Sequence, residues 1–472
     1  RLVAERAHSA REAVDIATKL LAEFGYFHDG RTYTFADANE AWQLAIHQGN
    51  SWVARKIHDN EVVYIPNNFM MDKVDLNDKE TWKIEPKQVE RAIKDGRHDA
   101  KNPIFNWRKV VAQESVRHER WNANRNVLAW KFLTGVEYND PEKFPYSAVI
   151  DRKLGVKDAM ALLRLHEDYI GQDQELYHSK SEGICRTTSH DSIVYNLTAD
   201  PTLTEAWKTL GRPCQSVFVP LYPLAGPAKG TAFTDPATAT KEHFAGTPAM
   251  FDYRADFTPH SVFSASNNAI DYLRGDELAK RTQLIQAEED KFMKDRAAVT
   301  KKAAGLKGEE RTKFLHDYNQ KSYDHVLKIM QAENARLMPN KVKILADVVK
   351  ADGDGTVDFA LLGAKGHEVL SANMEATRAG MSANQLNSTR QWKNFAPAEK
   401  MVYKDVNNDG ITDVVFTFKA KDVTKGAVAG AAMDLWLYTQ INGHRVTGFD
   451  VGPVENDKVK MNKGARDGKG LL

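Results

Sequence analysis

The sequence predicts an α+β fold that is followed by a C-terminal β-sandwich. An amphipathic helix is expected near the start, because apolar residues recur there at spacings of four and three up to Gly25. Segments rich in aromatic and β-branched residues come next, and short strand-like segments appear again after Pro339-Asn340. The apolar residues of the helix are Ala10, Val14, Ala17, Leu21 and Phe24.

Four strand candidates follow this helix, and the residues between them predict an antiparallel meander. Turn-forming groups such as Asp37-Ala38-Asn39, Gly49-Asn50 and Asp59-Asn60 separate neighbouring candidates. The candidates are Thr32–Ala36, Ala41–His47, Ser51–Ile57 and Glu61–Ile65.

Two helical blocks are expected in the middle of the chain. The block from about Lys87 to Gly211 has its clearest helices at Val156–His166 and Thr204–Leu210, and the block from about Asn268 to Leu337 has two charged helices that meet at Gly305-Leu306-Lys307-Gly308. We expect the charges of the second block to face solvent, with a coiled-coil partner as the alternative. The inward-facing residues would be Leu284, Ile285, Phe292, Phe314, Leu315, Val326, Leu327 and Met330.

The C-terminal strands define the predicted domain organisation. Residues 1–340 would form the first domain with its helical insertions, residues 341–455 the β-sandwich, and residues 456–472 a polar tail. The strand candidates of the sandwich are Val342–Val349, Thr356–Leu362, Lys400–Tyr403, Asp413–Lys419, Met433–Ile441 and His444–Val451.

Composition excludes several classes of protein. The 65 Lys and Arg against 64 Asp and Glu leave a net charge of +1, which does not favour nucleic-acid binding. Because the sequence contains no uninterrupted apolar run of about 18 residues, no transmembrane segment is expected. Two cysteines, Cys185 and Cys214, are too few for a disulfide framework, although one bridge stays possible. Each is predicted to be a buried packing residue.

The segment from Asp405 to Asp413 has the pattern of a calcium loop. Oxygen-bearing side chains occupy positions 1, 3, 5 and 9, Gly410 allows the sharp turn at position 6, and the carbonyl of position 7 is available. Phe416 stands where an EF-hand has its Glu, so the loop is expected between two strands. The alternative is a turn rich in Asp and Asn that binds no metal. The predicted ligands are Asp405, Asn407, Asp409, Ile411 and Asp413.

Five short motifs, in this order, resemble the C69 dipeptidases, which are N-terminal-nucleophile (Ntn) hydrolases. The resemblance covers roughly residues 1–340, while the other common enzyme motifs that we sought are not found. The five motifs are Gly30 to Trp42 (GRTYTFADANEAW), Gly49 to Arg55 (GNSWVAR), Ile65 to Phe69 (IPNNF), Ile184 to Thr187 (ICRT) and Leu210 to Cys214 (LGRPC).

The resemblance implies a four-layer αββα core and hydrolysis of dipeptides by a cysteine at the mature N-terminus. The thiolate of that cysteine would attack the scissile carbonyl, its own α-amino group would act as the base, and no cofactor would be needed. Neither Cys185 nor Cys214 matches the position of this nucleophile. We therefore expect the nucleophile in a companion chain or segment outside the sequence, and an assembly of identical chains is left open.

Two site residues follow from the resemblance. Asn67 matches the asparagine that helps to form the oxyanion hole in this superfamily, and Arg186 matches an active-site arginine of the related acylases. The alternatives are a strand-end turn for Asn67 and a surface ion pair for Arg186.

The C-terminal part resembles a domain of secreted bacterial proteins, through Ala360 to Gly363 (ALLG) and the calcium loop. The expected location is therefore the periplasm or the exterior of a bacterium, where millimolar calcium suits such a loop. The predicted function is that of a secreted cysteine-type dipeptidase with structural Ca²⁺. The alternative is a non-catalytic surface or assembly protein that is built on the same fold.

Overall fold

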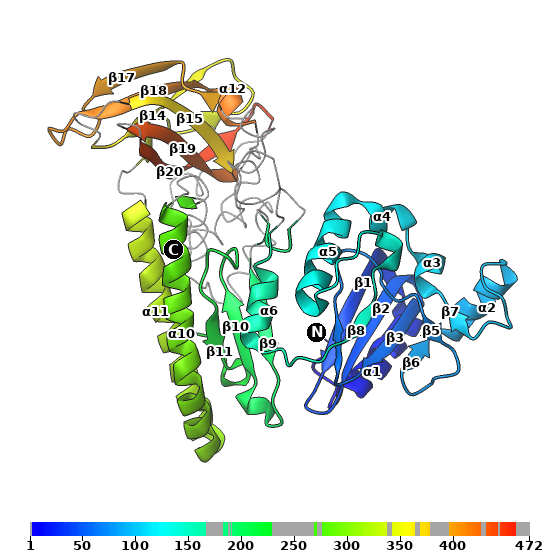
Figure 1. Ribbon diagram of the computed structural model, residues 1–472. Helices are drawn as coiled ribbons and strands as arrows, with labels where there is room; N and C mark the ends of the chain where they lie inside the picture. Colours follow the sequence, from blue (N-terminus) through cyan, green and yellow to red (C-terminus); the bar gives the residue numbers. More distant parts are fainter. Residues whose placement is uncertain are drawn as a thin grey trace. The chain divides into compact units, whose positions relative to one another are not determined.

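Figure 1 shows the computed structural model of the protein. The chain divides into two units. The first unit comprises residues 1–167, 182–184 and 196–204, and the second comprises residues 168–181, 185–195 and 205–472. Each unit is described by itself. The structure describes residues 2–166, 183–186, 189, 191–228, 269–270, 276–337, 342–363, 369–377, 396–425, 431–441 and 444–458.

An antiparallel sheet of four strands forms the centre of the first unit. Its strands have the order β1 (Tyr26–Ala36), β2 (Ala41–Gly49), β3 (Ser51–Ile57) and β6 (Trp82–Ile84). The predicted meander is therefore confirmed for its first three strands. The fourth predicted strand is present as β4 (Glu61–Val63), but its place in the meander is wrong, because β4 pairs with β8 (Ser147–Val149) outside this sheet.

The helix α1 (Ala10–Phe24) confirms the predicted first helix. Ser9 caps its start by accepting a hydrogen bond from the backbone of Glu12, and Gly25 ends it with a φ of 69°. The prediction that Phe24 belongs to the buried stripe is wrong, because its side chain is 73% exposed in the last turn of the helix.

The two faces of the sheet bury different residues, as the alternation of side chains along a strand requires. One face packs against α1, and the other packs against residues that include those of α5 (Arg120–Thr134). The α1 face contains Trp42, Leu44, Ile46 and Ala54, and the opposite face contains Ala45 and Val53 together with Trp130 and Leu133 of α5.

Short elements complete the first unit. The predicted helix at Val156–His166 is present as α6, although it ends at Leu163. The other elements are β5 (Val74–Asp75), β7 (Ile104–Phe105), α2 (Pro86–Lys94), α3 (Trp107–Val111), α4 (Glu114–His118), η1 (Pro141–Lys143) and η2 (Pro201–Leu203).

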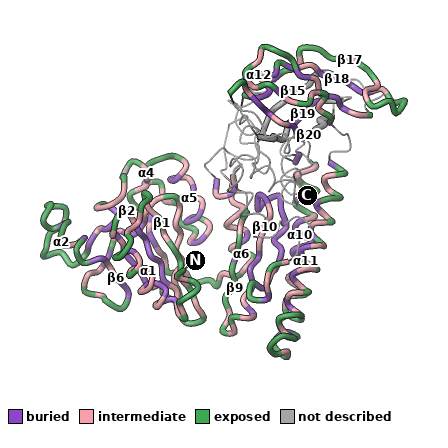
Figure 2. Tube along the Cα trace, turned by 180° about the vertical axis from the view of Figure 1, so that it is seen from behind, coloured by how far each residue is buried: buried purple, intermediate pink, exposed green. Residues whose placement is uncertain are grey.

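A three-stranded sheet opens the second unit, in the order β11 (Val219–Leu221), β10 (Glu205–Thr209) and β9 (Ser192–Asn196). The predicted helix at Thr204–Leu210 is wrong, because this segment is the central strand β10. Residues 205–207 and 209 are buried in it, as the purple tube of Figure 2 shows. A segment this short has no clear period, so its pairing on both sides decides its conformation.

Two long helices follow, α10 (Asp276–Gly305) and α11 (Gly308–Leu337), after the short η3 (Pro223–Ala225). Their turn at Gly305–Gly308 is confirmed, and Ile285, Phe292, Leu315, Val326 and Met330 are buried as predicted. Leu284, Phe314 and Leu327 are only half-buried. The charged residues do not all face solvent, because Arg281 is buried against Glu333 and Glu289 accepts a hydrogen bond from the backbone of Phe218.

Two further sheets lie at the C-terminal end of the second unit, and side chains from both contribute to one apolar core. The predicted strand Val342–Val349 is in fact two strands, one in each sheet, because the chain bends at residues 346–348. The strand β15 was not predicted. The first sheet has the order β12 (Val342–Ile344), β14 (Thr356–Leu361), β18 (Asp413–Lys419), β17 (Lys400–Lys404), and the second β13 (Val349–Lys350), β20 (His444–Glu455), β19 (Ala431–Ile441), β15 (Val369–Thr377), β16 (Ala396–Pro397).

The predicted domain boundary at residue 340 stays a prediction, because residues 338–341 lie outside the described part, as do residues 459–472 of the predicted tail. A short helix, α12 (Ala420–Val423), follows β18. Among the described residues, no helix is both long enough and apolar enough to cross a membrane.

Candidate functional site

Asn67 lies in the first unit, four residues after β4, and Asn122 of α5 holds its backbone. The N–H of Asn67 donates a hydrogen bond to Oδ1 of Asn122 at 3.1 Å, and its carbonyl accepts one from Nδ2 of the same residue at 3.5 Å. The side chain of Asn67 is exposed. Its backbone is thus fixed while its amide group faces outward, which is the arrangement that a side-chain hydrogen-bond donor requires.

Asn122 itself is completely buried, and it is the residue that sequence reasoning missed. Its Nδ2 also donates to the carbonyl of Val116 at 2.9 Å, and its own carbonyl accepts a hydrogen bond from Nδ2 of Asn126 at 3.1 Å. A signal was present in the sequence. Asparagine is unfavourable inside a helix unless its side chain has a specific partner, and α5 contains three, at 122, 124 and 126.

Phe69 fixes the other side of the Asn67 loop by packing directly on Gly30 of β1. A Cβ atom on Gly30 would lie 2.2 Å from the Phe69 ring, and the φ of Gly30 is +152°, so only glycine fits at this position. Trp107 also packs on Phe69, and the two rings meet edge to face with their centroids 4.8 Å apart. Two of the family-like motifs, at Gly30 and at Phe69, therefore meet in space.

Arg117 supports the loop from within. Its side chain is buried, and it donates from Nε to the carbonyl of Pro141 at 2.5 Å and from one terminal nitrogen to that of Phe144 at 3.0 Å. Its other terminal nitrogen lies 3.5 Å from Sδ of Met70, three residues after Asn67. The residues that follow Asn67 are thus held by a buried cation that is bound to carbonyl groups.

A polar hollow of about 540 Å³ has Met71 among the residues that line it. On its wall, Arg55 makes two hydrogen bonds with Glu61, at 2.9 and 2.8 Å, and its guanidinium lies over the rings of Trp82 and Tyr146. Burial would raise the pKa of Glu61, but the hydrogen bonds and charge of Arg55 outweigh it and lower that pKa. Burial raises the pKa of Tyr146, so its hydroxyl stays protonated and donates to Gln43 at 2.7 Å.

Arg186 lies in the second unit. Its side chain is half-buried, and its backbone N–H donates to Oγ of Ser189 at 3.2 Å. Thr187, Thr188 and His190 lie outside the described residues. The structure thus holds the backbone N–H of Arg186 by a hydrogen bond to Ser189.

Cys185 and Cys214 are both buried, as predicted, with exposed fractions of 0% and 8%. Their sulfur atoms lie 3.4 Å apart, and both residues are thiols. Sequence reasoning treated them separately, because 29 positions divide them and no spacing rule connects two such residues.

The predicted calcium loop joins β17 to β18, and three of its side chains turn back onto its own backbone. One oxygen of Asp405 accepts from the N–H of Gly410 at 3.0 Å, and Asp409 accepts from the N–H of Ile411 at 2.8 Å. Asn407 accepts from the N–H of Asp409 at 3.3 Å and donates to the Asp409 carboxylate at 2.8 Å, and Gly410 has a φ of +80°. The other oxygen of Asp405, Oδ1, is buried without a hydrogen-bond partner, and a cation would satisfy it.

Asp413 closes the loop at position 9. It is completely buried, and its two oxygens accept hydrogen bonds from the backbone N–H groups of Gly363 at 2.9 Å and Val406 at 3.0 Å. In such loops the residue at position 9 often binds calcium through a water molecule, so this role is compatible with a metal. Asp405, Asn407, Asp409 and the Ile411 carbonyl would then be the direct ligands.

Comparison with known proteins identifies the family. The chain is similar to a "Probable dipeptidase" of Latilactobacillus sakei (23% identity, 47% of this chain and 48% of that protein) and to a "Probable dipeptidase B" of Lactococcus lactis subsp. lactis (28%, 54% and 52%). It spans about half the length of these two relatives. The profile of peptidase family C69 matches residues 1–244, more than half of the 472 residues. The chain therefore belongs to peptidase family C69.

Proposed function

We propose that this chain is part of a secreted cysteine-type dipeptidase with an Ntn-hydrolase core. The single observation that carries the proposal is the Asn67 loop, in which a family-like motif presents an exposed amide on a backbone that Asn122 fixes. Membership of family C69 and the names of its relatives support the same activity. The sheet with α1 on one face would be one αβ half of the αββα core.

The nucleophile of this enzyme would be a cysteine outside residues 1–472. Cys185 and Cys214 are poor candidates, because both are buried and each sulfur is in contact with the other. An Ntn nucleophile also needs a free α-amino group beside its thiolate, and both cysteines lie inside the chain, where this nitrogen is part of a peptide bond. A companion segment or chain that begins with cysteine would supply both the thiolate and the α-amino group that acts as base.

Asn67 and Arg186 would serve this cysteine in different ways. As the thiolate adds to the scissile carbonyl, negative charge develops on the oxygen, and the Asn67 amide would donate a hydrogen bond to it. Arg186 would hold the nucleophile segment by charge-assisted hydrogen bonds. This mechanism uses proton transfer and hydrogen bonding, so it needs no catalytic cofactor.

The C-terminal sheets would form a β-sandwich that binds one structural Ca²⁺. The buried, unpartnered oxygen of Asp405 supports a cation at this loop, because desolvating a carboxylate oxygen without a partner is unfavourable. A loop of this kind suits the calcium concentrations outside cells, and we therefore propose a periplasmic or extracellular location.

Hydrolysis of dipeptides by the complete native protein, with and without thiol alkylation, tests the proposed activity. The proposal predicts hydrolysis that alkylation abolishes. Hydrolysis that resists alkylation would contradict the cysteine mechanism. An absence of hydrolysis in a protein whose companion segment is present would favour the non-catalytic surface or assembly protein.

A further inference from the structure

Cys185 and Cys214 come together because of the way two strands of the second unit are joined. Cys185 lies seven residues before β9 begins at Ser192, and Cys214 lies five residues after β10 ends at Thr209. The N–H of Ser192 donates to Oγ1 of Thr209 at 2.9 Å, so the start of β9 and the end of β10 are neighbours. The segments that carry the two cysteines therefore leave the sheet at the same edge.

Contacts that do not involve the cysteines hold both segments in place. Lys208 forms an ion pair with Asp191 across the two strands, and Oγ1 of Thr209 also bonds to the carbonyl of Gly211 at 3.0 Å. A turn closed by the N–H of Gln215 and the carbonyl of Arg212, at 3.0 Å, contains Cys214. The start of β9 and the turn that contains Cys214 are thus held by contacts that exist without any covalent bond between the cysteines.

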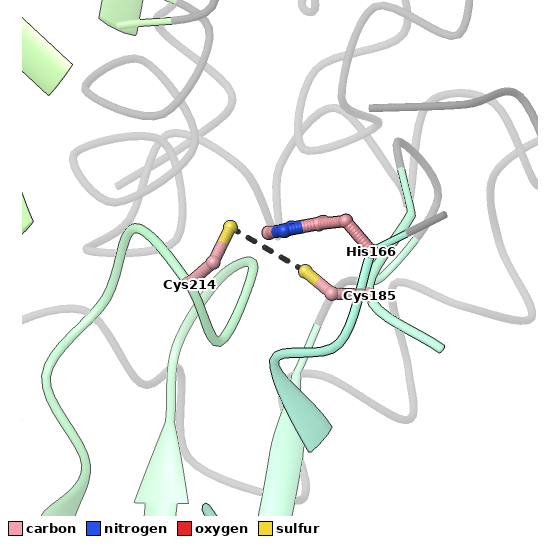
Figure 3. A group of neighbouring side chains, drawn as sticks. All are labelled: His166, Cys185 and Cys214. Carbon is pink, nitrogen blue, oxygen red and sulfur yellow. Dashed lines mark hydrogen bonds between the residues drawn. The ribbon is translucent and has the colours of Figure 1, made fainter. Parts of the chain in front are cut away.

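The two sulfur atoms point toward each other at 3.4 Å, as Figure 3 shows. Figure 3 also draws His166, which belongs to the first unit. A disulfide bond is about 2.05 Å long, so the sulfurs would have to approach by roughly 1.4 Å. Side-chain rotation can supply a movement of this size while the backbone stays in place.

We propose that Cys185 and Cys214 form a disulfide bond that closes the loop containing β9 and β10. The oxidant is a small disulfide, RSSR, of the kind present in oxidising compartments. The Cys214 thiolate, on the more exposed residue, attacks one sulfur of RSSR and releases one RS⁻. The Cys185 thiolate then attacks the Cys214 sulfur of this mixed disulfide and releases a second RS⁻. Two protein thiols are oxidised, one RSSR is reduced to two RSH, and the two protons pass to the released thiolates.

The bond would restrain the backbone of Arg186, because Cys185 precedes it directly in the chain. It would also connect two of the family-like motifs, those at Ile184 to Thr187 and at Leu210 to Cys214. The proposal does not depend on dipeptidase activity, since it rests only on the geometry of the two thiols.

Peptide mapping of the full chain tests the proposal directly. The protein is incubated with oxidised glutathione, denatured in N-ethylmaleimide and digested with trypsin, which leaves Cys185 in peptide 181–186 and Cys214 in peptide 209–229. The expected product is these two peptides joined by a disulfide, with neither carrying maleimide. Maleimide on both peptides, or a separate glutathione adduct on each without a link, would overturn the proposal. A second result would also overturn the proposal. In it, Zn²⁺ protects both thiols from maleimide, EDTA reverses this protection, and oxidised glutathione gives no linked product.

Thermal melting supplies a second test that does not depend on digestion. Cys185→Ser, Cys214→Ser and the double variant should all melt about 5–10 °C below the oxidised wild type, with no difference among the three. Reductant should lower the wild type to the same temperature and leave the variants unchanged. Ser216→Ala, at a nearby buried position, is the control, because its effect should be the same with and without reductant. A wild type that is indifferent to reductant would overturn the proposal.

Discussion

The backbone N–H of Asn67 donates a hydrogen bond to Oδ1 of Asn122 at 3.1 Å, across 55 positions of the chain. This bond connects the loop that follows β4 to the helix α5. Asn122 is buried, whereas the side chain of Asn67 is exposed. The two asparagines therefore have different roles. Asn67 presents a polar group, and Asn122 determines where that group is.

Replacing Asn67 with alanine should reduce kcat of the complete enzyme about 10²–10³-fold, because one donor to the developing oxyanion is lost. The free energy of unfolding should change by less than about 0.5 kcal/mol, since the side chain is exposed. Steady-state kinetics and denaturant unfolding measure the two effects. Asn77→Ala, at an exposed turn of the same unit, is the control that should change neither. A loss of tenfold or less for Asn67→Ala would assign Asn67 to structure.

Replacing Asn122 with alanine should affect stability and activity together. The change leaves the N–H of Asn67 and the carbonyl of Val116 without their buried partner, which costs about 1–3 kcal/mol of unfolding free energy. The value of kcat should fall as well, because the Asn67 loop loses its position. Urea unfolding of Asn122→Ala beside Asn67→Ala separates the two residues. Equal stability of the two variants would show that Asn122 does not support the loop.

Arg186→Lys should lower kcat about 10–100-fold while leaving the fold intact. A lysine keeps the charge, but it cannot reproduce the planar pair of hydrogen bonds that an arginine makes. The half-buried position of Arg186 is compatible with such fixed bonds. Kinetics of this variant, with circular dichroism as the check on folding, decide the matter. Kinetics equal to those of the wild type would reduce Arg186 to a surface residue.

Glu61→Gln should destabilise the first unit at neutral pH and have little effect in acid. The folded protein lowers the pKa of Glu61 below 4.5, so the charged form stabilises the fold above that pH and the contribution disappears as the pH falls through the folded pKa. Arg55 and Glu61 are each 10% exposed, and breaking the pair should cost about 2–3 kcal/mol. Unfolding free energies from pH 7 to pH 3 should therefore converge for the wild type and the variant. Glu80→Gln is the control, because the side chain of Glu80 is 89% exposed. Its unfolding free energy should follow that of the wild type at every pH.

Calcium should raise the melting temperature of the C-terminal sheets, and Asp409→Ala should remove this effect. At a calcium concentration 10- to 100-fold above Kd, binding should add about 1–3 kcal/mol of stability. Asp354→Ala is the matched control, since Asp354 is 97% exposed and forms an ion pair with Lys421 outside the loop. Calorimetry with calcium or EDTA gives the answer. A transition that EDTA leaves unchanged would mean that the loop is a turn without metal.

Much of the fold was predictable where the residue pattern was long or strongly marked. The strand β3 appears with the predicted bounds, the helix α1 ends at the predicted Gly25, and the two long charged helices meet at the predicted glycines. Thr204–Leu210 was mistaken for a helix, because seven residues do not establish a period and the neighbouring strands decide the outcome. The split of Val342–Val349 was also unpredictable, since each half pairs with a strand far along the chain.

The candidate site was predictable only where a motif marked it. Asn67 was found through the motif around it, whereas Asn122 has no motif and acts through a hydrogen bond across 55 positions. Gly30 and Phe69 were each part of a motif, but their contact depends on the pairing of β1 with β2 and on the path of the loop. The same holds for Cys185 and Cys214, which the sheet β11-β10-β9 brings together.

The central claim is that the catalytic cysteine lies outside residues 1–472. The most direct test is to identify the cysteine whose alkylation stops hydrolysis and is prevented by excess dipeptide. The complete native protein is treated with iodoacetamide until dipeptide hydrolysis stops, with and without excess dipeptide, and the modified peptides are identified by mass spectrometry. We predict one alkylated cysteine whose modification excess dipeptide prevents. It should be an N-terminal cysteine outside residues 1–472, and Cys185 and Cys214 should stay unmodified. Inactivation that coincides with a label on Cys185 or Cys214 would contradict the account.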